Sequence, residues 1–265
     1  MEYSNNKKCL IIYLGNAYSE KTLNYSKEYM YSVDLRDNKS NHIDNIYAPL
    51  ISMGYNVETL MLTNKHKYSD LFLDMFSAYN FEYNEFTDDE LKNLYGLYWM
   101  RTPQGWGPGI FKAGARLLKV KDEIPKTYDL YVIIRADCLF KKSLIQMDVD
   151  YDKINYLFPE TDNQFFTHNR EFYLDNHGDE LIFFREYLRV NGITLNIIPQ
   201  KYFNMVSSYL WMEHMSLYFM QRDLYPIFSL KDDVHFICGT EKAYVTDPNF
   251  CENPIYTFNK KIYSS

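Results

Sequence analysis

Two charged residues, Arg135 and Asp137, follow directly on an apolar run that begins at Tyr128 and reads YDLYVII. Charges at the end of a buried strand are costly unless something pairs with them. A carboxylate can hold a divalent cation that bridges phosphates, because Mg²⁺ and Mn²⁺ prefer hard oxygen ligands. An arginine beside it can fork onto a phosphate or a carboxylate. The pair therefore indicates a ligand site, with an Arg–Asp ion pair that closes a loop as the alternative.

The second half of the chain offers residues for proton transfer. Asp179 lies in the segment His-Gly-Asp-Glu that starts at residue 177 and precedes an aromatic stretch. Asp, Glu or His can serve as a general base for an acceptor hydroxyl, and we take Asp179 as the first candidate. An acidic first helical turn explains the same residues equally simply. His235, after two aspartates, is a candidate metal ligand together with Asp137.

The elements that must position these residues follow from the hydrophobic pattern. Residues 8–14 (KCLIIYL) form an unbroken apolar run, which predicts a strand buried on both faces. Residues 40–53 have helical spacing, made irregular by Pro49 and stopped by Gly54. Residues 55–62 alternate as a second strand, and residues 128–140 predict the clearest buried strand. In an open α/β sheet, ligands bind in the crevice outside the carboxyl ends of the strands.

The remaining pattern alternates in the same way. We expect helices over residues 68–79, 110–120, 180–190 and 209–220, and strands over 154–158 and 193–198. The tail after Asp247 has no clear period and is expected to wrap the surface. The predicted fold class is therefore α/β, with a mostly parallel central sheet and helices on both faces. We expect residues 1–265 to form a single domain without a linker.

The motif YDLYVIIRADCLF resembles the "YD–hydrophobic run–R-x-D-x-x-F" segment of GT-A-type glycosyltransferases, which include viral and capsule-related members. Further segments fall in the order typical of that family: Arg36, the helix NHIDNIYAPL, Gly-Tyr-Asn-Val at residues 54–57, and Thr63. The resemblance covers about residues 8–140 well and the remainder in outline. It implies a donor-binding half over about 8–140 and an acceptor-side half over about 141–265.

The resemblance also implies roles for single residues. In this family the Asp of the R-x-D segment belongs to a DxD-like pair that holds a metal ion, Mn²⁺ or Mg²⁺, and a nucleotide diphosphate. In this chain Arg135 replaces the first Asp of that pair, so only Asp137 carries over as a catalytic and metal-binding residue. The residues that the resemblance places around the nucleotide sugar are Gly15, Asn16, Arg36, Thr63, Gln104, Lys112 and Arg135.

The expected activity is transfer of a sugar from a nucleotide-diphosphate sugar to a hydroxyl acceptor, such as a glycan. A second hypothesis is a non-catalytic protein that kept this fold, which the missing first Asp favours. A third is a nucleotidyltransferase, although the first strand leads to GNAYSEK and not to a loop rich in Gly and basic residues. The loop GWGPG lacks the spacing of a Walker loop or a dinucleotide fingerprint.

Composition limits the partners. The formal net charge is −7 with a pI of about 5.4, and no basic run exceeds a pair, so a nucleic-acid partner is not expected. The four cysteines form no CxxC pair and no disulfide framework, and Cys9, Cys138 and Cys238 lie in apolar runs. Neither a signal peptide nor a membrane-spanning segment is apparent. We expect a cytoplasmic protein, in the host cytoplasm if it is viral.

Overall fold

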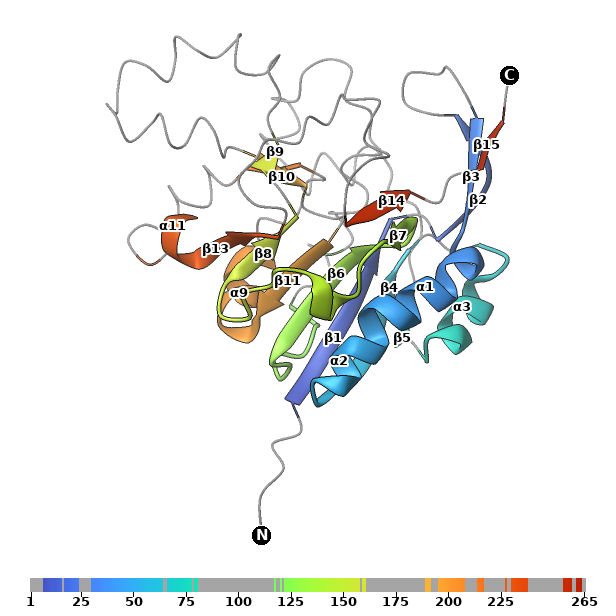
Figure 1. Cartoon of the computed structure of the whole chain (residues 1–265). Coiled ribbons are helices and arrows are strands. Elements are labelled where there is room, and N and C mark those ends of the chain that lie inside the picture. Colours follow the sequence, from blue (N-terminus) through green and yellow to red (C-terminus); the bar gives the residue numbers. More distant parts are fainter. Residues whose placement is uncertain are drawn as a thin grey trace, which may run out of the picture.

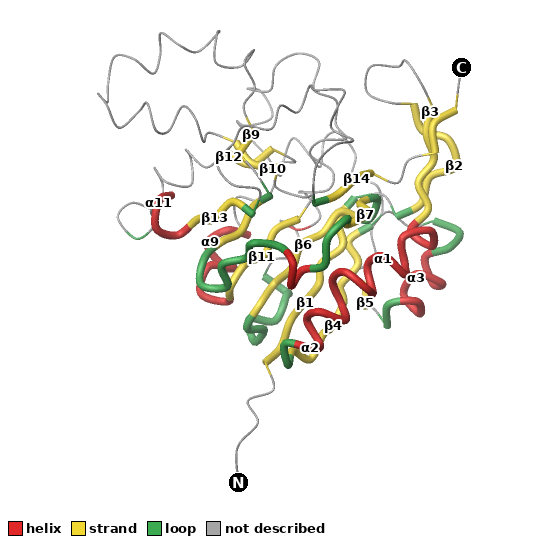
Figure 2. Tube along the Cα trace, in the orientation of Figure 1, coloured by secondary structure: helices red, strands yellow, loops and turns green. Residues whose placement is uncertain are grey.

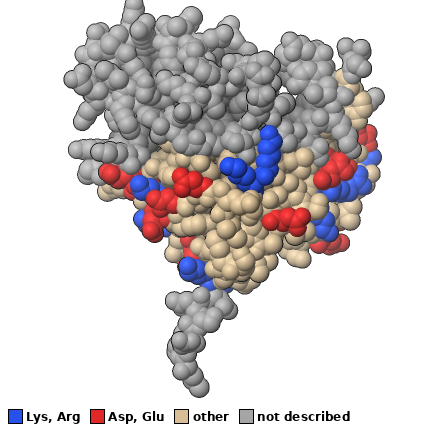
Figure 3. All heavy atoms as spheres, in the orientation of Figure 1, with Lys and Arg blue, Asp and Glu red and all other residues tan. Residues whose placement is uncertain are grey.

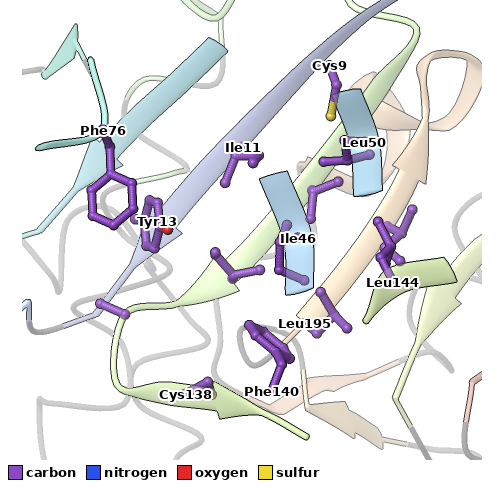
Figure 4. Close-up of a cluster of buried hydrophobic side chains, with 14 of the residues drawn as sticks. Cys9, Ile11, Tyr13, Ile46, Leu50, Phe76, Cys138, Phe140, Leu144 and Leu195 are labelled. Carbon is purple, nitrogen blue, oxygen red and sulfur yellow. The ribbon is translucent and has the colours of Figure 1, made fainter. Parts of the chain in front are cut away.

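The apolar run near the start of the chain forms the strand β1, Lys7–Leu14, as the sequence predicts. Successive side chains of a strand point to opposite faces. Accordingly Leu10, Ile12 and Leu14 enter one hydrophobic cluster, while Cys9, Ile11 and Tyr13 enter a second one on the other face. Figure 4 shows part of this second cluster, with helix residues packed over the strand. Burial on both faces explains why no polar residue interrupts the run.

The structure is a computed structural model that describes residues 7–15, 17–23, 30–63, 66–77, 79–80, 117, 120, 122–157, 159–160, 189–191, 195–207, 214–216, 227, 230–237, 255–258 and 261–263. Within these residues, β1 lies in a seven-stranded sheet of order β13-β8-β11-β6-β1-β4-β5 (Figure 1). The other strands of this sheet are β4 (Tyr55–Leu62), β5 (Tyr79–Asn80), β6 (Leu130–Arg135), β8 (Ile154–Tyr156), β11 (Leu195–Pro199) and β13 (Val234–Phe236).

The sheet is mixed and mostly parallel. β1 pairs in parallel with β4 and β6, β4 with β5, and β13 with β8. Only β11 runs against its two neighbours, β6 and β8. The expectation of an α/β fold with a mostly parallel sheet is therefore confirmed.

One face of the sheet is covered by a long helical segment, which begins with a 3₁₀ turn, η1 (Leu35–Asn38) (Figure 2). It continues as α1 (Lys39–His42), a π-helical stretch η2 (Ile43–Tyr47) and α2 (Ala48–Ser52). Pro49 has no N–H and its ring crowds the carbonyl of the residue four positions earlier, so a regular helix cannot run through it. The π-helical stretch lies just before Pro49 and accounts for the predicted irregularity.

Gly54 ends this helical segment in the left-handed conformation, with φ of +87°. Glycine adopts that conformation without a steric penalty. The Gly54 amide caps the helix by donating a hydrogen bond to the carbonyl of Ile51. The helix α3 (Ser69–Met75) covers the same face through Phe72. It is shorter than the predicted helix over 68–79, since Tyr79 already belongs to β5.

The opposite face is covered by α9 (Gln200–Ser207), whose Tyr202 and Phe203 enter the first cluster together with Leu117 and Val120. The Phe203 ring stacks on Tyr131 of β6 at a centroid distance of 3.6 Å. Helices therefore cover both faces of the sheet.

Three expectations about single elements are wrong, and the helix expected over 180–190 ends where a strand begins at Arg189, its other residues lying outside the described ones. The run over 128–140 is not one strand, because a turn at Ala136–Asp137 separates β6 from β7 (Cys138–Phe140). The helix expected over 209–220 contains the strand β12 (His214–Ser216), which pairs with β10 (Arg189–Asn191). The tail contains β14 (Tyr256–Phe258), which pairs with β7, and β15 (Lys261–Tyr263), which pairs with β3. Pairing with distant strands decides all three, and local sequence periodicity does not record it.

Smaller elements complete the described structure. They are β2 (Tyr18–Leu23), β3 (Met30–Asp34), the 3₁₀ turn η3 (Leu144–Gln146), β9 (Pro159–Glu160) and α11 (Leu230–Asp233). Among the helices described here, none combines the length and apolar character required to cross a membrane. Cys9 and Cys138 are buried free thiols, in agreement with the sequence.

Candidate functional site

The strand order places a topological switch point between β1 and β6. Along the chain, the sheet first grows outward from β1 through β4 to β5, and then continues on the other side of β1 with β6. Crossovers that leave two parallel neighbours in opposite directions open a crevice outside their carboxyl ends, which is where open α/β sheets bind ligands. The residues at the ends of β1 and β6 are therefore the first place to look for a site.

The residues that meet there are ones that the sequence singled out. Strand register sets Leu14 beside both Leu62 and Arg135, and the amide of Ala136 donates to the carbonyl of Leu14 at 3.1 Å. Gly15 follows with φ of +88°, and a Cβ added there would lie 3.8 Å from Cγ of Arg135. Thr63, which follows β4 and is buried, lies one residue beyond the Leu14–Leu62 pair. The fold thus brings Gly15, Thr63 and Arg135 together at the carboxyl ends of β1, β4 and β6.

Arg135 and Asp137 form a side-on ion pair. Nε of Arg135 donates to Oδ1 of Asp137 at 2.6 Å, and Nη2 donates to Oδ2 at 3.3 Å. The Arg135 side chain is 19% exposed and the Asp137 side chain 6%. Both carboxylate oxygens therefore face the guanidinium, which offsets the cost of burying the acid. The loop-closing ion pair is thus present, with its partly exposed guanidinium at the carboxyl end of β6.

A row of polar residues on the helical segment holds the turn that carries Asp137. Asn38 donates from Nδ2 to the carbonyl of Ala136 at 2.8 Å, and Asn41 donates in the same way to the carbonyl of Phe140 at 2.8 Å. The Phe140 amide donates back to Oδ1 of Asn41 at 2.7 Å. Asn45 adds a longer contact of 3.2 Å to the same carbonyl. The asparagine side chains therefore supply hydrogen-bond partners for the backbone groups of Ala136 and Phe140 on the side that faces the helical segment.

His42 completes this row from the interior. It is fully buried, and its Nε2 lies 2.6 Å from the carbonyl of Cys138, while its Nδ1 lies 2.9 Å from the Tyr13 hydroxyl. A carbonyl can only accept, so Nε2 carries the proton and Nδ1 accepts from Tyr13. Burial lowers the pKa of His42 from 6.5 to about 4, so the ring is neutral at physiological pH.

Sequence reasoning did not assign this group of four residues, Asn38, Asn41, His42 and Asn45, which we call the helix clasp. Its members follow one another at spacings of three, one and three, which places them on one face of a helix. An amide-rich stripe facing a buried strand was the signal that could have identified them, because such side chains are costly to bury unless they bond backbone groups.

The other predicted site residues lie in different surroundings. Arg36, expected at a diphosphate, forks onto Asp34, with Nε to Oδ1 at 2.9 Å, and its guanidinium lies 4.0 Å from the centroid of the Tyr68 ring. It still belongs to the segment that contacts the site, because the neighbouring Leu35 amide donates to the carbonyl of Ala17 at 2.9 Å. Asn16, Gln104, Lys112 and Asp179 lie outside the described residues.

Asp137 and His235 do not meet in the described structure. His235 belongs to β13, and β8 and β11 separate that strand from β6. Three strand spacings amount to roughly 14 Å. The His235 Nε2 instead lies 2.8 Å from the carbonyl oxygen of Asp148. The two residues predicted as joint metal ligands are therefore not brought together.

The donor set that the structure does describe fits a divalent cation poorly. A hard cation needs several oxygen ligands, and within the described ranges no three His, Cys, Asp or Glu side chains come close enough to hold one. The two oxygens of Asp137 already face a guanidinium, whose positive charge opposes a second cation beside it.

Charged residues of both signs lie among one another on the face shown in Figure 3, among the described residues.

Comparisons with known proteins add no relative: no protein-family model matches the chain, and no curated protein sequence matches it significantly. The site must therefore be judged from its own residues.

Proposed function

We propose that this protein is a nucleotide-sugar glycosyltransferase of the GT-A type, with its donor site at the carboxyl ends of β1 and β6. The observation that carries the proposal is the position of Arg135 and Gly15 on either side of the switch point between these strands. An arginine there suits a phosphate, because its planar donors match the geometry of phosphate oxygens. A glycine facing it keeps the first loop small where a ligand must approach.

The proposed reaction transfers a sugar from a nucleotide-diphosphate sugar to a hydroxyl acceptor. Arg135 would offset the charge that develops on the diphosphate as the nucleotide leaves, a role that is effective when the donor is already held in place. Asp137 would orient Arg135, and the helix clasp would orient Asp137. Asp179 remains the candidate general base, and Lys112 and Arg36 remain candidate phosphate-binding residues.

A binding assay tests the donor site directly. UDP-, GDP-, TDP- and CMP-sugars are screened by thermal shift, with and without Mn²⁺. A ligand present at about 100 times its Kd stabilises a protein by about 2.7 kcal/mol, which such an assay detects easily. We expect one nucleotide to raise the Tm. If none of them does in either buffer, the donor-site assignment is withdrawn.

Two glycines provide a matched pair of variants. Gly15 and Gly54 have nearly the same backbone conformation, but only Gly15 has a site residue, Arg135, near the added Cβ. Each change to Ala costs roughly 1 kcal/mol of stability for a left-handed conformation. We expect Gly15→Ala to lower the affinity for the nucleotide and Gly54→Ala to leave it unchanged. An equal loss of affinity in both variants argues against a ligand beside Gly15.

The second hypothesis is a non-catalytic binding protein of the same fold. The side-on Arg135–Asp137 pair favours it specifically, because that arrangement also serves simply to close the turn. Release of nucleoside diphosphate from the bound donor separates the two readings. Turnover supports the transferase, whereas a Tm shift without release in the presence of candidate acceptors supports the binding protein. A nucleotidyltransferase would release pyrophosphate from a nucleoside triphosphate in the same assay.

A further inference from the structure

A diphosphate bound near Asp137 would need a positively charged partner to offset its negative charge. In many proteins a divalent cation provides that charge. In this chain a guanidinium already lies against the only acid at the turn between β6 and β7. Nε of Arg135 is 2.6 Å from Oδ1 of Asp137, and Nη2 is 3.3 Å from Oδ2. A cation bound to Asp137 would therefore have to lie beside a permanent positive charge, since arginine does not lose its proton in proteins.

Asp137 is also almost fully covered, and its backbone is held in place. Its side chain is 6% exposed, and the backbone on both sides of it is held by the helix clasp. Asn38 bonds the carbonyl of Ala136, and His42 bonds the carbonyl of Cys138. The helix clasp therefore fixes the backbone on both sides of Asp137, while the two hydrogen bonds from Arg135 hold both carboxylate oxygens.

Neither His42 nor His235 supplies a replacement ligand in the described structure. His42 uses both ring nitrogens, one toward Cys138 and one toward the Tyr13 hydroxyl. His235 lies at the far edge of the sheet against Asp148.

We propose that the Arg135–Asp137 site binds the phosphate groups of its ligand without a divalent cation, and that Arg135 supplies the positive charge that the cation provides elsewhere. The choice of a phosphate ligand rests on the proposed function, while the exclusion of the cation rests on the ion pair alone. A guanidinium is planar and always charged, and its N–H donors match the geometry of phosphate oxygens, which is why the phosphate is assigned to Arg135. Asp137 acts as a positioning residue for Arg135.

The first experiment measures nucleotide-sugar binding to the full chain by thermal shift, in EDTA and in Mn²⁺. We expect the same Kd within twofold in the two buffers, and a loss of at least tenfold in affinity in Arg135→Gln in both. A shift that requires Mn²⁺, or a Kd that Mn²⁺ tightens tenfold or more, overturns the proposal. If no nucleotide binds in either buffer, the proposed function fails, and the metal question is decided by the second experiment.

The second experiment measures binding of Mn²⁺ alone by electron paramagnetic resonance. We expect no Mn²⁺ bound to the wild-type protein, and a gain of Mn²⁺ binding in Arg135→Asp, where the opposing charge becomes a second carboxylate. Arg36→Asp is the matched control, because Arg36 also forks onto an aspartate two residues away, at an exposed position, and the change in net charge is the same.

The outcomes of this second experiment are distinct. Mn²⁺ bound to the wild-type protein contradicts the proposal, and so does a folded Arg135→Asp variant that binds no more Mn²⁺ than Arg36→Asp. If Arg135→Asp does not fold, Arg135→Glu replaces it in the same comparison, with Arg36→Glu as its control. The second carboxylate is again expected to allow measurable Mn²⁺ binding, and its absence overturns the proposal.

Discussion

Arg135 and Asp137 lie two residues apart, and each makes the burial of the other tolerable. The Asp137 side chain is almost fully covered, whereas Arg135 keeps about a fifth of its side chain exposed. Loss of the guanidinium therefore leaves a covered carboxylate without its cation, and loss of the carboxylate leaves an arginine that can still reach water. The two single substitutions should differ in their effect on folding for this reason.

We expect Arg135→Ala to destabilise the protein by about 2 to 3 kcal/mol, toward the low end of values for broken buried pairs because Arg135 is partly exposed. Asp137→Ala should cost less, and the double variant should cost less than the sum of the two. Urea unfolding of the three variants measures these free energies. A cost below about 0.5 kcal/mol for Arg135→Ala contradicts a stabilising pair.

His42 gives a second prediction at the scale of one residue, since burial lowers its pKa from 6.5 to about 4. The unfolded chain binds a proton at this residue below about pH 6.5, while the folded protein does so only near pH 4. The unfolded state therefore carries more protons between these values, and the contribution of neutral His42 to stability is lost as the pH falls through this window. The total loss is of the order of 3 kcal/mol.

The measurement compares the free energy of unfolding of the wild type with that of His42→Gln from pH 7 to pH 4. Glutamine keeps a donor for the Cys138 carbonyl but does not titrate. Because groups common to both proteins cancel, the difference between them should shrink as the pH falls. NMR provides an independent check, with the single proton of neutral His42 expected on Nε2 at pH 7. A difference that does not change with pH refutes the assignment of this titration to His42.

At the scale of elements, the helix clasp joins two segments about a hundred residues apart in the chain. Asn41 forms two hydrogen bonds with the backbone of Phe140, whereas Asn45 forms one longer contact with the same residue. The two asparagines lie one helical turn apart on the same segment, so they form a natural pair for comparison. They differ mainly in whether they satisfy the Phe140 amide.

We expect Asn41→Ala to cost about 1 to 3 kcal/mol, because it leaves a backbone N–H without its partner, and Asn45→Ala to cost less than about 1 kcal/mol. Hydrogen exchange of the Phe140 amide should accelerate in Asn41→Ala and change little in Asn45→Ala. Nucleotide binding should weaken in Asn41→Ala if the clasp orients the turn at Asp137. Equal protection of the Phe140 amide in both variants excludes this role of Asn41.

At the scale of the whole molecule, the end of the chain returns to elements near its start and middle. β15 pairs with β3, and β14 pairs with β7 next to the site (Figure 1). The Lys141 amide donates to the carbonyl of Ile255 at 2.7 Å, and Ile255 is 3% exposed. The tail therefore closes two strand edges.

Deletion of residues 255–265 should lower the free energy of unfolding by several kcal/mol, because it exposes buried apolar surface and unpaired strand edges. Thermal unfolding of the truncated and full chains measures the loss. Tyr263→Phe is the control, since it removes only a hydroxyl that lies 3.1 Å from Oγ of Ser32, and should cost less than about 1 kcal/mol. An unchanged Tm in the truncated chain shows that the tail does not support the fold.

Part of this architecture could be read from the sequence alone. The strands β1, β4 and β6, the irregular helix before Gly54 and the α/β class follow from the hydrophobic period and from Pro and Gly, which act on the backbone locally. The charges at Arg135 and Asp137 indicated a site because they end an otherwise apolar run. The same reasoning predicted one strand over 128–140, since nothing local marks the turn at Ala136–Asp137.

The tertiary structure alone decided which segments pair with one another and in which direction the strands run. The antiparallel course of β11, the strand at 214–216, the separation of His235 from Asp137 and the contacts of the helix clasp all depend on which distant segments meet. A local period states which side chains of a segment are buried, but it does not state what buries them. The Arg135–Asp137 pair shows both levels: its residues are visible in the sequence, while its burial and the backbone contacts around it come from a helical segment about a hundred residues away.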